Sequence, residues 1–282
     1  MDKRNPIPSD VKRRLRQESG FGCCKCGKPI IEYHHIIPYT KIDPHFRVED
    51  MMCLCPYCHH EATVGAMNLE EQRKLKNHPL NIRNKKAEGF LKVNQNSLVI
   101  TLGDNQFITD NSIISIDNNN LISIKINSEG QLELSLKLYN KENKLILEIV
   151  ENEWKSGDYL PWDIESSFQW LIIRNKKYDI SIEINAKQIP LILTGKLWYN
   201  NHEIKISPNG IFFNAKKSSG QISNLCFVGS NLELDTNLGT FSICPHPIYN
   251  KHSMVPGVLE NRISTGLQKF KEIITTHNSG LA

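Results

Sequence analysis

Short runs of isoleucine, leucine and valine alternate with Asn, Asp, Gly and Ser along residues 98–243. Apolar runs bounded by turn residues are typical of β-strands. The runs occupy residues 98–102, 113–116, 121–126, 132–139, 145–150, 168–173, 180–184, 189–193, 203–206, 222–228, 232–234 and 241–243. Their regular spacing predicts a β-sandwich or a β-solenoid. Both alternatives stay open because no repeat of fixed length is clean.

The pattern before residue 80 is different and predicts short helices around one strand. Val11 and Leu15 form the apolar stripe of a helix that Ser9 or Asp10 would cap and that ends near Gly20. Residues 30–37 predict a strand that ends before a proline, and residues 59–63 a helix. Residues 68–71, with the sequence Asn-Leu-Glu-Glu, resemble a capping box that opens a polar helix.

These patterns predict an α+β chain with four segments. Residues 1–80 form a small domain, residues 81–96 a linker, and residues 97–250 an all-β domain. Apolar residues at helical spacing between 259 and 274 predict a helix within residues 251–282, which would cover the β domain or pair two chains. A length of 282 residues with 39% hydrophobic content suits two compact domains better than one.

The cysteines are concentrated near the amino terminus. Six of the eight lie between residues 23 and 58, and the other two, Cys226 and Cys244, are expected to be core thiols. This distribution favours metal binding in a reducing compartment over a disulfide framework. No stretch approaches the roughly 18 apolar residues that a membrane span requires. We therefore expect a cytoplasmic protein without a membrane partner.

Two Cys-x-x-Cys hooks predict a structural zinc site. Cys23 and Cys26 form the first hook, and Cys55 and Cys58 the second. Two such pairs suit one tetrahedral zinc ion, because each hook supplies two thiolates and the second ties down the intervening chain. Cys24 and Cys53 lie within two residues of these ligands, so a shifted register is an alternative, as is a set of reduced buried thiols.

Three histidines lie within or beside the hooks. His34 and His35 are adjacent on the predicted strand, where successive side chains face opposite ways. One is therefore expected to bind a metal and the other to transfer protons. His59 follows the last cysteine directly and would supply a ligand from the opposite wall. The alternative is a noncatalytic zinc module in which these histidines have packing roles.

Residues 9–65 resemble the HNH endonuclease family, whose ββα-metal finger often carries the same pair of hooks. The resemblance implies that His34 and His59 bind a catalytic Mg²⁺ or Mn²⁺ and that His35 is the general base. The central asparagine of the family is replaced by Asp50. We count Asp50 with His35 among the catalytic residues. An ionised aspartate accepts hydrogen bonds but cannot donate them, so Asp50 would hold the loop or bind metal.

By this resemblance the chain would hydrolyse phosphodiester bonds, most naturally in double-stranded DNA, and would leave 5′ phosphate and 3′ hydroxyl ends. Defence against foreign DNA is the setting we expect, with the β domain serving targeting, regulation or assembly. A noncatalytic DNA-binding or scaffold protein is the alternative. In a further alternative, the β domain senses a small signal or a partner chain that activates the nuclease.

Charge is distributed unevenly along the chain. Residues 1–92 carry 17 Lys and Arg against 11 Asp and Glu, and residues 93–282 carry 17 against 19. The basic excess of six in the first segment favours a nucleic-acid partner. Phosphate contacts are predicted for Lys12, Arg13 and Arg16 on the first helix, and for Lys41 and Arg47 in the following loop, although basic helix faces are often only solvated.

Four tryptophans, Trp154, Trp162, Trp170 and Trp198, give residues 151–200 an aromatic character. They predict a ligand-binding or protein-binding surface, or else ordinary core packing. A homo-oligomer or an activating partner would bind through the β domain or the carboxyl-terminal helix.

Overall fold

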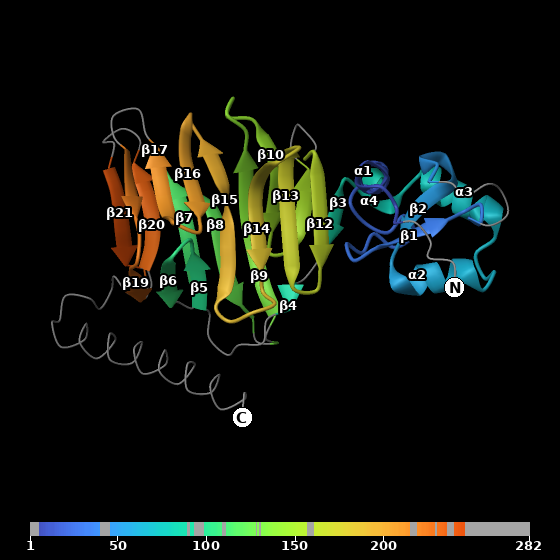
Figure 1. Ribbon diagram of the computed structural model, residues 1–282, viewed down its shortest axis with the longest axis horizontal. Coiled ribbons are helices and arrows are strands. Elements are labelled where there is room, and N and C mark those ends of the chain that lie inside the picture. The colour runs from blue at the N-terminus through green and yellow to red at the C-terminus, as the bar shows by residue number, and fades with distance from the viewer. Residues whose placement is uncertain are drawn as a thin grey trace.

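A computed structural model of the chain describes residues 6–39, 46–88, 91–92, 99–108, 111–127, 129, 131–156, 161–214, 219–228, 230–235 and 240–245. It has a small amino-terminal part, with most of the helices, beside a larger part built from two sheets (Figure 1). The chain is mixed and strand-rich, as the sequence predicts. The helix expected within residues 251–282 lies outside the described residues.

The amino-terminal part surrounds one short hairpin. Strands β1 (Glu32–His35) and β2 (Met51–Leu54) pair antiparallel, with His34 opposite Met52. Leu15 packs against Met51 on one side, and a second cluster joins the hairpin to the cysteine hooks. The remaining elements are helix α1 (Ser9–Glu18), the 3-10 turn η1 (Val48–Asp50), α2 (Pro56–Thr63), α3 (Leu69–Asn77) and α4 (Leu80–Asn84).

The helix ends follow the sequence signals in part: α2 begins at Pro56, three residues before the predicted start at His59. The side chain of Asn68 caps α3, because its Oδ1 accepts a hydrogen bond of 2.9 Å from the Glu71 amide. Helix α1 is followed by Gly20 at a φ of 67°, a conformation that favours glycine. Its N-cap position is Pro8, without a side-chain cap, so neither Ser9 nor Asp10 caps it as predicted.

The larger part consists of two sheets. One has the order β21-β20-β7-β8-β9-β10-β11-β3, with β4 also paired to β9, and the other runs from β12 to β18 in sequence order with β5, β6 and β19 attached. The first sheet contains β3 (Lys86–Glu88), β4 (Leu91–Lys92), β7 (Asn111–Ile116), β8 (Asn119–Ile126), β9 (Gln131–Tyr139), β10 (Leu145–Val150), β11 (Glu153–Ser156), β20 (Ser230–Asp235) and β21 (Thr240–Pro245). The second contains β5 (Val99–Leu102), β6 (Asn105–Ile108), β12 (Asp163–Ser167), β13 (Trp170–Lys176), β14 (Asp179–Asn185), β15 (Leu191–Tyr199), β16 (His202–Ser207), β17 (Gly210–Asn214), β18 (Ser219–Ile222) and β19 (Cys226–Val228).

The two sheets share one hydrophobic core. Leu134 and Leu136 from the first sheet lie in the same buried cluster as Ile182 and Leu193 from the second. Most neighbouring strands pair antiparallel as successive hairpins, and parallel pairing is limited to β5·β15, β6·β19 and β7·β20 among the described residues. A solenoid stacks equivalent strands of successive coils, so this meander favours the sandwich alternative.

The segment expected to be a linker contributes to the fold. Its start forms most of α4, where the Asn81 amide donates hydrogen bonds of 3.2 Å to the Gly20 carbonyl and 3.0 Å to the Gly27 carbonyl. Strand β3 then pairs with β11, and β4 with β9. In the described part of residues 81–96 the chain is therefore held to both the hooks and the first sheet. No helix among the described residues is long and apolar enough to cross a membrane.

Candidate metal and catalytic site

The two hooks bring four thiols together. The sulfur atoms of Cys23, Cys26, Cys55 and Cys58 all lie within 4.8 Å of one another, and the Cys26 and Cys55 sulfurs are 3.5 Å apart. In a tetrahedral zinc site with Zn–S bonds of about 2.3 Å, sulfur atoms lie about 3.8 Å apart. The cluster therefore fits a structural metal such as zinc, in the predicted register.

Local backbone geometry positions each hook. In the first, the Cys23 carbonyl accepts a 2.8 Å hydrogen bond from the amide of Gly27, whose φ of 77° suits a residue without a side chain. The second hook opens α2: Cys55 is the N-cap and Pro56 follows in the first turn. Proline fits there because its missing N–H would have no partner within the helix.

The two remaining cysteines of this region are interior residues. Burial is the main cause that raises the pKa of Cys24 and of Cys53 to about 12. The Cys24 amide donates a hydrogen bond to the Cys53 carbonyl, which joins the first hook to β2. Burial also raises the pKa of the ligand Cys55, but hydrogen bonds from the Cys58 amide and neighbouring thiols outweigh it and lower the pKa overall. Burial instead raises the pKa of Cys26, to about 11, and raises that of Cys58.

The adjacent histidines face different surroundings, as strand geometry predicts. His34 is buried and its ring lies 5.0 Å from that of His59, centroid to centroid. The half-buried ring of His35 instead lies 5.6 Å from Tyr39 and 6.3 Å from Phe46. The strand thus separates a histidine pair from a histidine in an aromatic environment.

Hydrogen bonds orient the facing rings of His34 and His59. The Nε2 atom of His34 lies 3.1 Å from Gln72 Oε1, and the Nδ1 atom of His59 lies 2.5 Å from Glu32 Oε2. The other ring nitrogen of each makes no hydrogen bond with the described residues. A histidine that binds metal through one ring nitrogen commonly donates a hydrogen bond from the other to such a partner. One nitrogen of each ring is thus held by a side chain of the protein.

The surroundings also keep His34 neutral. Burial is the largest cause that lowers the pKa of His34, and the nearby charges of His59 and His35 lower it further, against the opposing hydrogen bond that His34 donates to Gln72 Oε1. A neutral imidazole has a lone pair for a metal ion. The protonation state is therefore the one that metal binding requires.

Asp50 lies between two arginines. Its Oδ1 accepts a 2.6 Å hydrogen bond from Arg73, and its Oδ2 is 3.0 Å from the Arg47 guanidinium. Arg73 also donates to the Glu49 carbonyl, and the Asp50 carbonyl accepts from the Ile36 amide. These contacts place Asp50 at the turn that ties β2 to α3 and to the chain after β1.

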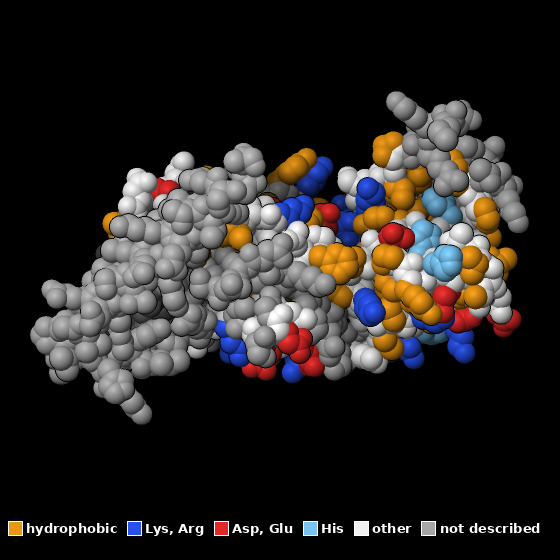
Figure 2. All heavy atoms as spheres, turned by 90° about the horizontal axis from the view of Figure 1, so that it is seen from below, with side chains coloured by type: hydrophobic (Ala, Val, Ile, Leu, Met, Phe, Trp, Pro, Cys, Tyr) orange, Lys and Arg blue, Asp and Glu red, His pale blue; other side chains and the backbone are white. Residues whose placement is uncertain are grey.

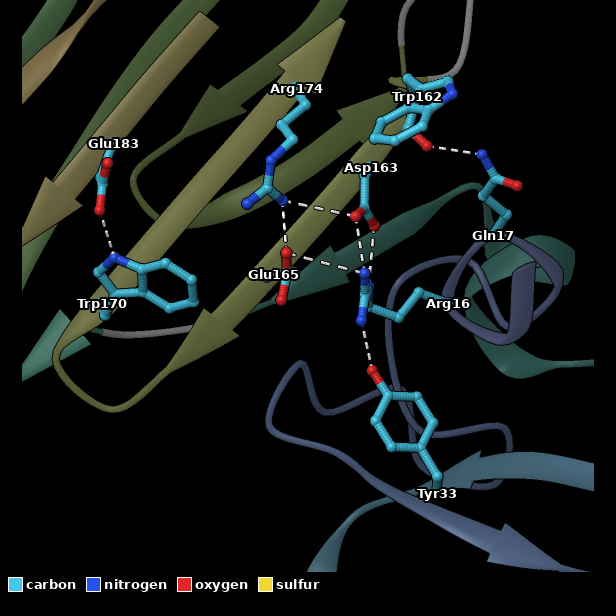
Figure 3. Close-up of polar contacts among 9 residues, drawn as sticks. All are labelled: Arg16, Gln17, Tyr33, Trp162, Asp163, Glu165, Trp170, Arg174 and Glu183. Atoms are coloured by element: carbon cyan, nitrogen blue, oxygen red, sulfur yellow. Dashed lines mark hydrogen bonds and ion pairs between the residues drawn. The ribbon is translucent and has the colours of Figure 1, made fainter. Parts of the chain in front are cut away.

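Arg16, predicted to contact phosphate, is buried between the two parts of the molecule. Its Nε lies 2.8 Å from Asp163 Oδ1 and its Nη2 2.6 Å from Asp163 Oδ2, while Nη1 donates to the Tyr33 hydroxyl (Figure 3). Arg174 contacts Asp163 and Glu165 from the other side. Burial lowers the pKa of Arg16, but Asp163, Tyr33 and Glu165 raise it by more. The guanidinium therefore retains its charge. The guanidinium is engaged internally and is not offered to a ligand.

The other predicted phosphate contacts have varied environments. The Arg13 guanidinium lies 4.3 Å from the centroid of the Trp162 ring, and the Lys12 ammonium 5.7 Å from that of Tyr33. Arg47 is paired with Asp50 but remains partly exposed. Lys41 lies outside the described residues. Figure 2 shows that several histidine side chains reach the surface of the amino-terminal part, with Lys and Arg nearby.

Three polar residues of the site escape sequence reasoning. Glu32 carries the short bond to His59, Gln72 the bond to His34, and Arg73 the bond to Asp50. Only Glu32 had a local signal, since it lies two positions before His34 and therefore on the same face of the strand. Comparison of the chain with known protein families, curated proteins and solved structures finds no match.

Proposed function

We propose that the chain is a metal-dependent endonuclease of the HNH type that hydrolyses phosphodiester bonds in double-stranded DNA. The single observation that carries this proposal is the facing pair His34 and His59, whose rings lie 5.0 Å apart and are each oriented by one protein hydrogen bond. The order of hairpin and helix, β1-β2-α2, with a thiol cluster beside it, agrees with a ββα-metal finger.

The histidines divide the chemistry. A Mg²⁺ or Mn²⁺ ion held by His34 and His59 would supply positive charge to the scissile phosphate. His35 is the general base, since a neutral imidazole accepts a proton from water. Glu32 and Gln72 position the two ligand rings, and the thiol cluster fixes the helix that carries His59.

Asp50 has a structural role in this proposal. Its carboxylate accepts from Arg73 and pairs with Arg47, so it already uses both oxygens within the protein. An asparagine at this position would present one acceptor oxygen to the two arginines. We therefore assign Asp50 to holding the turn before β2 and not to proton transfer.

The test is cleavage of a supercoiled plasmid with added Mg²⁺ or Mn²⁺. We expect His35→Ala to reduce the cleavage rate by at least about 100-fold, since general-base catalysis contributes about 10²–10⁴-fold. His60→Ala is the matched control, because His60 is exposed on the same helix as His59 and has no assigned role. Zinc content, measured by elemental analysis, should stay the same in both variants.

Undiminished cleavage by His35→Ala would refute the proposed base. A wild-type chain that holds zinc and binds DNA but never cuts it with either cation would instead indicate a noncatalytic DNA-binding protein.

A further inference from the structure

A cavity of about 610 Å³ lies in the larger part of the molecule, outside the histidine site. Its walls come from both sheets: the turn between β9 and β10, residues just before β12, the turn between β13 and β14, and strand β15. Ligand pockets for small molecules usually occupy about 300–1,000 Å³. The volume therefore suits a ligand of nucleotide size.

Aromatic rings line this cavity. Trp162, Trp198 and Tyr178 all contribute to its walls, and Tyr178 is 89% exposed. Trp162 and Trp198 are half-buried, whereas Trp154 lies in the core. Ordinary core packing thus accounts for Trp154 but not for the aromatic side chains at the cavity. Planar rings that remain accessible are suited to stacking on a flat ligand.

Positive charge accompanies the rings. The lining contains four lysines against two carboxylates, Glu142 and Asp179; the lysines are Lys141, Lys176, Lys177 and Lys196. Lys196 lies 3.4 Å from Asp179. Within the described part of the chain the other three are not paired with any carboxylate, and Lys141 lies 4.9 Å from the Trp198 ring centroid. An anionic group of a ligand would find unneutralised ammonium groups here.

One polar atom at this cavity lacks a partner. Asn175 lines the cavity, and its Oδ1 is buried without a hydrogen bond. A buried acceptor without a partner destabilises the fold, because it has lost its hydrogen bonds to water. A donor group of a ligand would reach this oxygen only if the Asn175 amide turned toward the cavity.

We infer that this cavity binds a nucleotide, with the base stacked against Trp198 and Trp162 and the phosphates on the lysines. A simple anion would not require the aromatic walls, and an apolar ligand would not require unpaired lysines. Base and phosphate together account for both. The same chemistry comes from a free nucleotide or from the end of a nucleic-acid strand.

The site is tested by binding alone, without a cleavage assay. The four common nucleoside triphosphates are titrated into the full-length protein by calorimetry and by tryptophan fluorescence. We expect saturable binding of at least one, and binding weaker by at least about tenfold for its nucleoside and for inorganic triphosphate, each of which lacks one half of the recognised group. A hexanucleotide of the same base identifies the source: comparable or tighter binding of the strand indicates a strand end, and weaker binding indicates a free nucleotide.

Two variants locate the site. Trp198→Ala removes the stacking wall, and Lys176→Glu reverses an exposed charge at the end of β13. Each should weaken binding about tenfold or more. Phe168→Ala and Lys205→Glu, at exposed positions outside the cavity, are the matched controls and should stay within twofold. Absence of saturation at 1 mM of every nucleotide, or unchanged binding by Lys176→Glu, would overturn the inference.

Discussion

At the scale of single residues, cysteines that are close in the sequence have different environments in and beside the thiol cluster. Cys26 belongs to the cluster, whereas Cys24, two positions earlier, is buried beside β2. We expect Cys26→Ala to lose the bound zinc and to unfold the amino-terminal part, because binding free energy at such sites is folding free energy.

Cys24→Ala is the matched variant and should keep about one zinc per chain. The measurement is elemental analysis together with circular dichroism before and after a chelator. Equal zinc loss in the two variants would show that the register is shifted.

The residue scale also shows what sequence can predict. The four ligands followed from the spacing of the hooks, because two residues between cysteines place both sulfurs on one ion. The contact of Gln72 with His34 could not be predicted, since the two residues are 38 positions apart and no local pattern links them. Arg16 looked like its exposed neighbour Arg14 in the sequence. Only the structure shows that Arg16 binds Asp163, which lies 147 positions further along the chain.

At the scale of elements, the contact between α1 and β12 joins the two parts of the molecule. The Arg16 and Asp163 side chains are only 8% and 4% exposed. Together with Arg174 and Glu165 they form a cluster of two cations and two anions. Gln17 donates to the Trp162 carbonyl and Ser166 to the Pro29 carbonyl beside them. The contact is therefore polar, buried and specific in geometry.

Removal of one partner should be costly. We expect Arg16→Met to lower the free energy of unfolding by about 3–5 kcal/mol, because it leaves the Asp163 carboxylate buried with less compensation. The double variant Arg16→Met/Asp163→Leu should recover much of this loss, since neither charge is then left alone. Urea denaturation followed by circular dichroism measures both. A double variant whose loss equals the sum of the single losses would contradict the coupling.

Prediction of elements succeeded where aliphatic residues are dense. The run at residues 145–150 matches β10, and the run at 132–139 differs from β9 by one residue. Strand β12, with the sequence Asp-Ile-Glu-Ser-Ser, was not predicted, because its polar side chains bind the amino-terminal part and give no apolar signal. Residues 81–96, predicted as a linker, include β3, and its pairing with β11 depends on a distant partner.

At the scale of the whole molecule, charge separates the two parts. The first 92 residues carry a net charge of +6 and the remainder −2, from 17 against 11 and 17 against 19 charged side chains. Fewer of these cations are available to DNA than the sequence predicts, because Arg16 is buried and Arg47 is paired with Asp50. On α1, Arg14 is exposed and Lys12 half-buried, and neither pairs with a carboxylate of the described residues.

DNA affinity should therefore depend on salt through a few positions of α1. Each phosphate neutralised contributes about −0.9 to the slope of log K against log salt concentration. We expect Lys12→Gln and Arg14→Gln each to make the slope less steep by about 0.9. Lys205→Gln, an exposed lysine on β16, is the matched control and should leave it unchanged. Binding of duplex DNA to the His35→Ala chain, measured by fluorescence anisotropy from 50 to 200 mM salt, avoids cleavage during the assay. A slope that falls equally in all three variants would mean that DNA responds to overall charge, and α1 would then have no particular place in the interface.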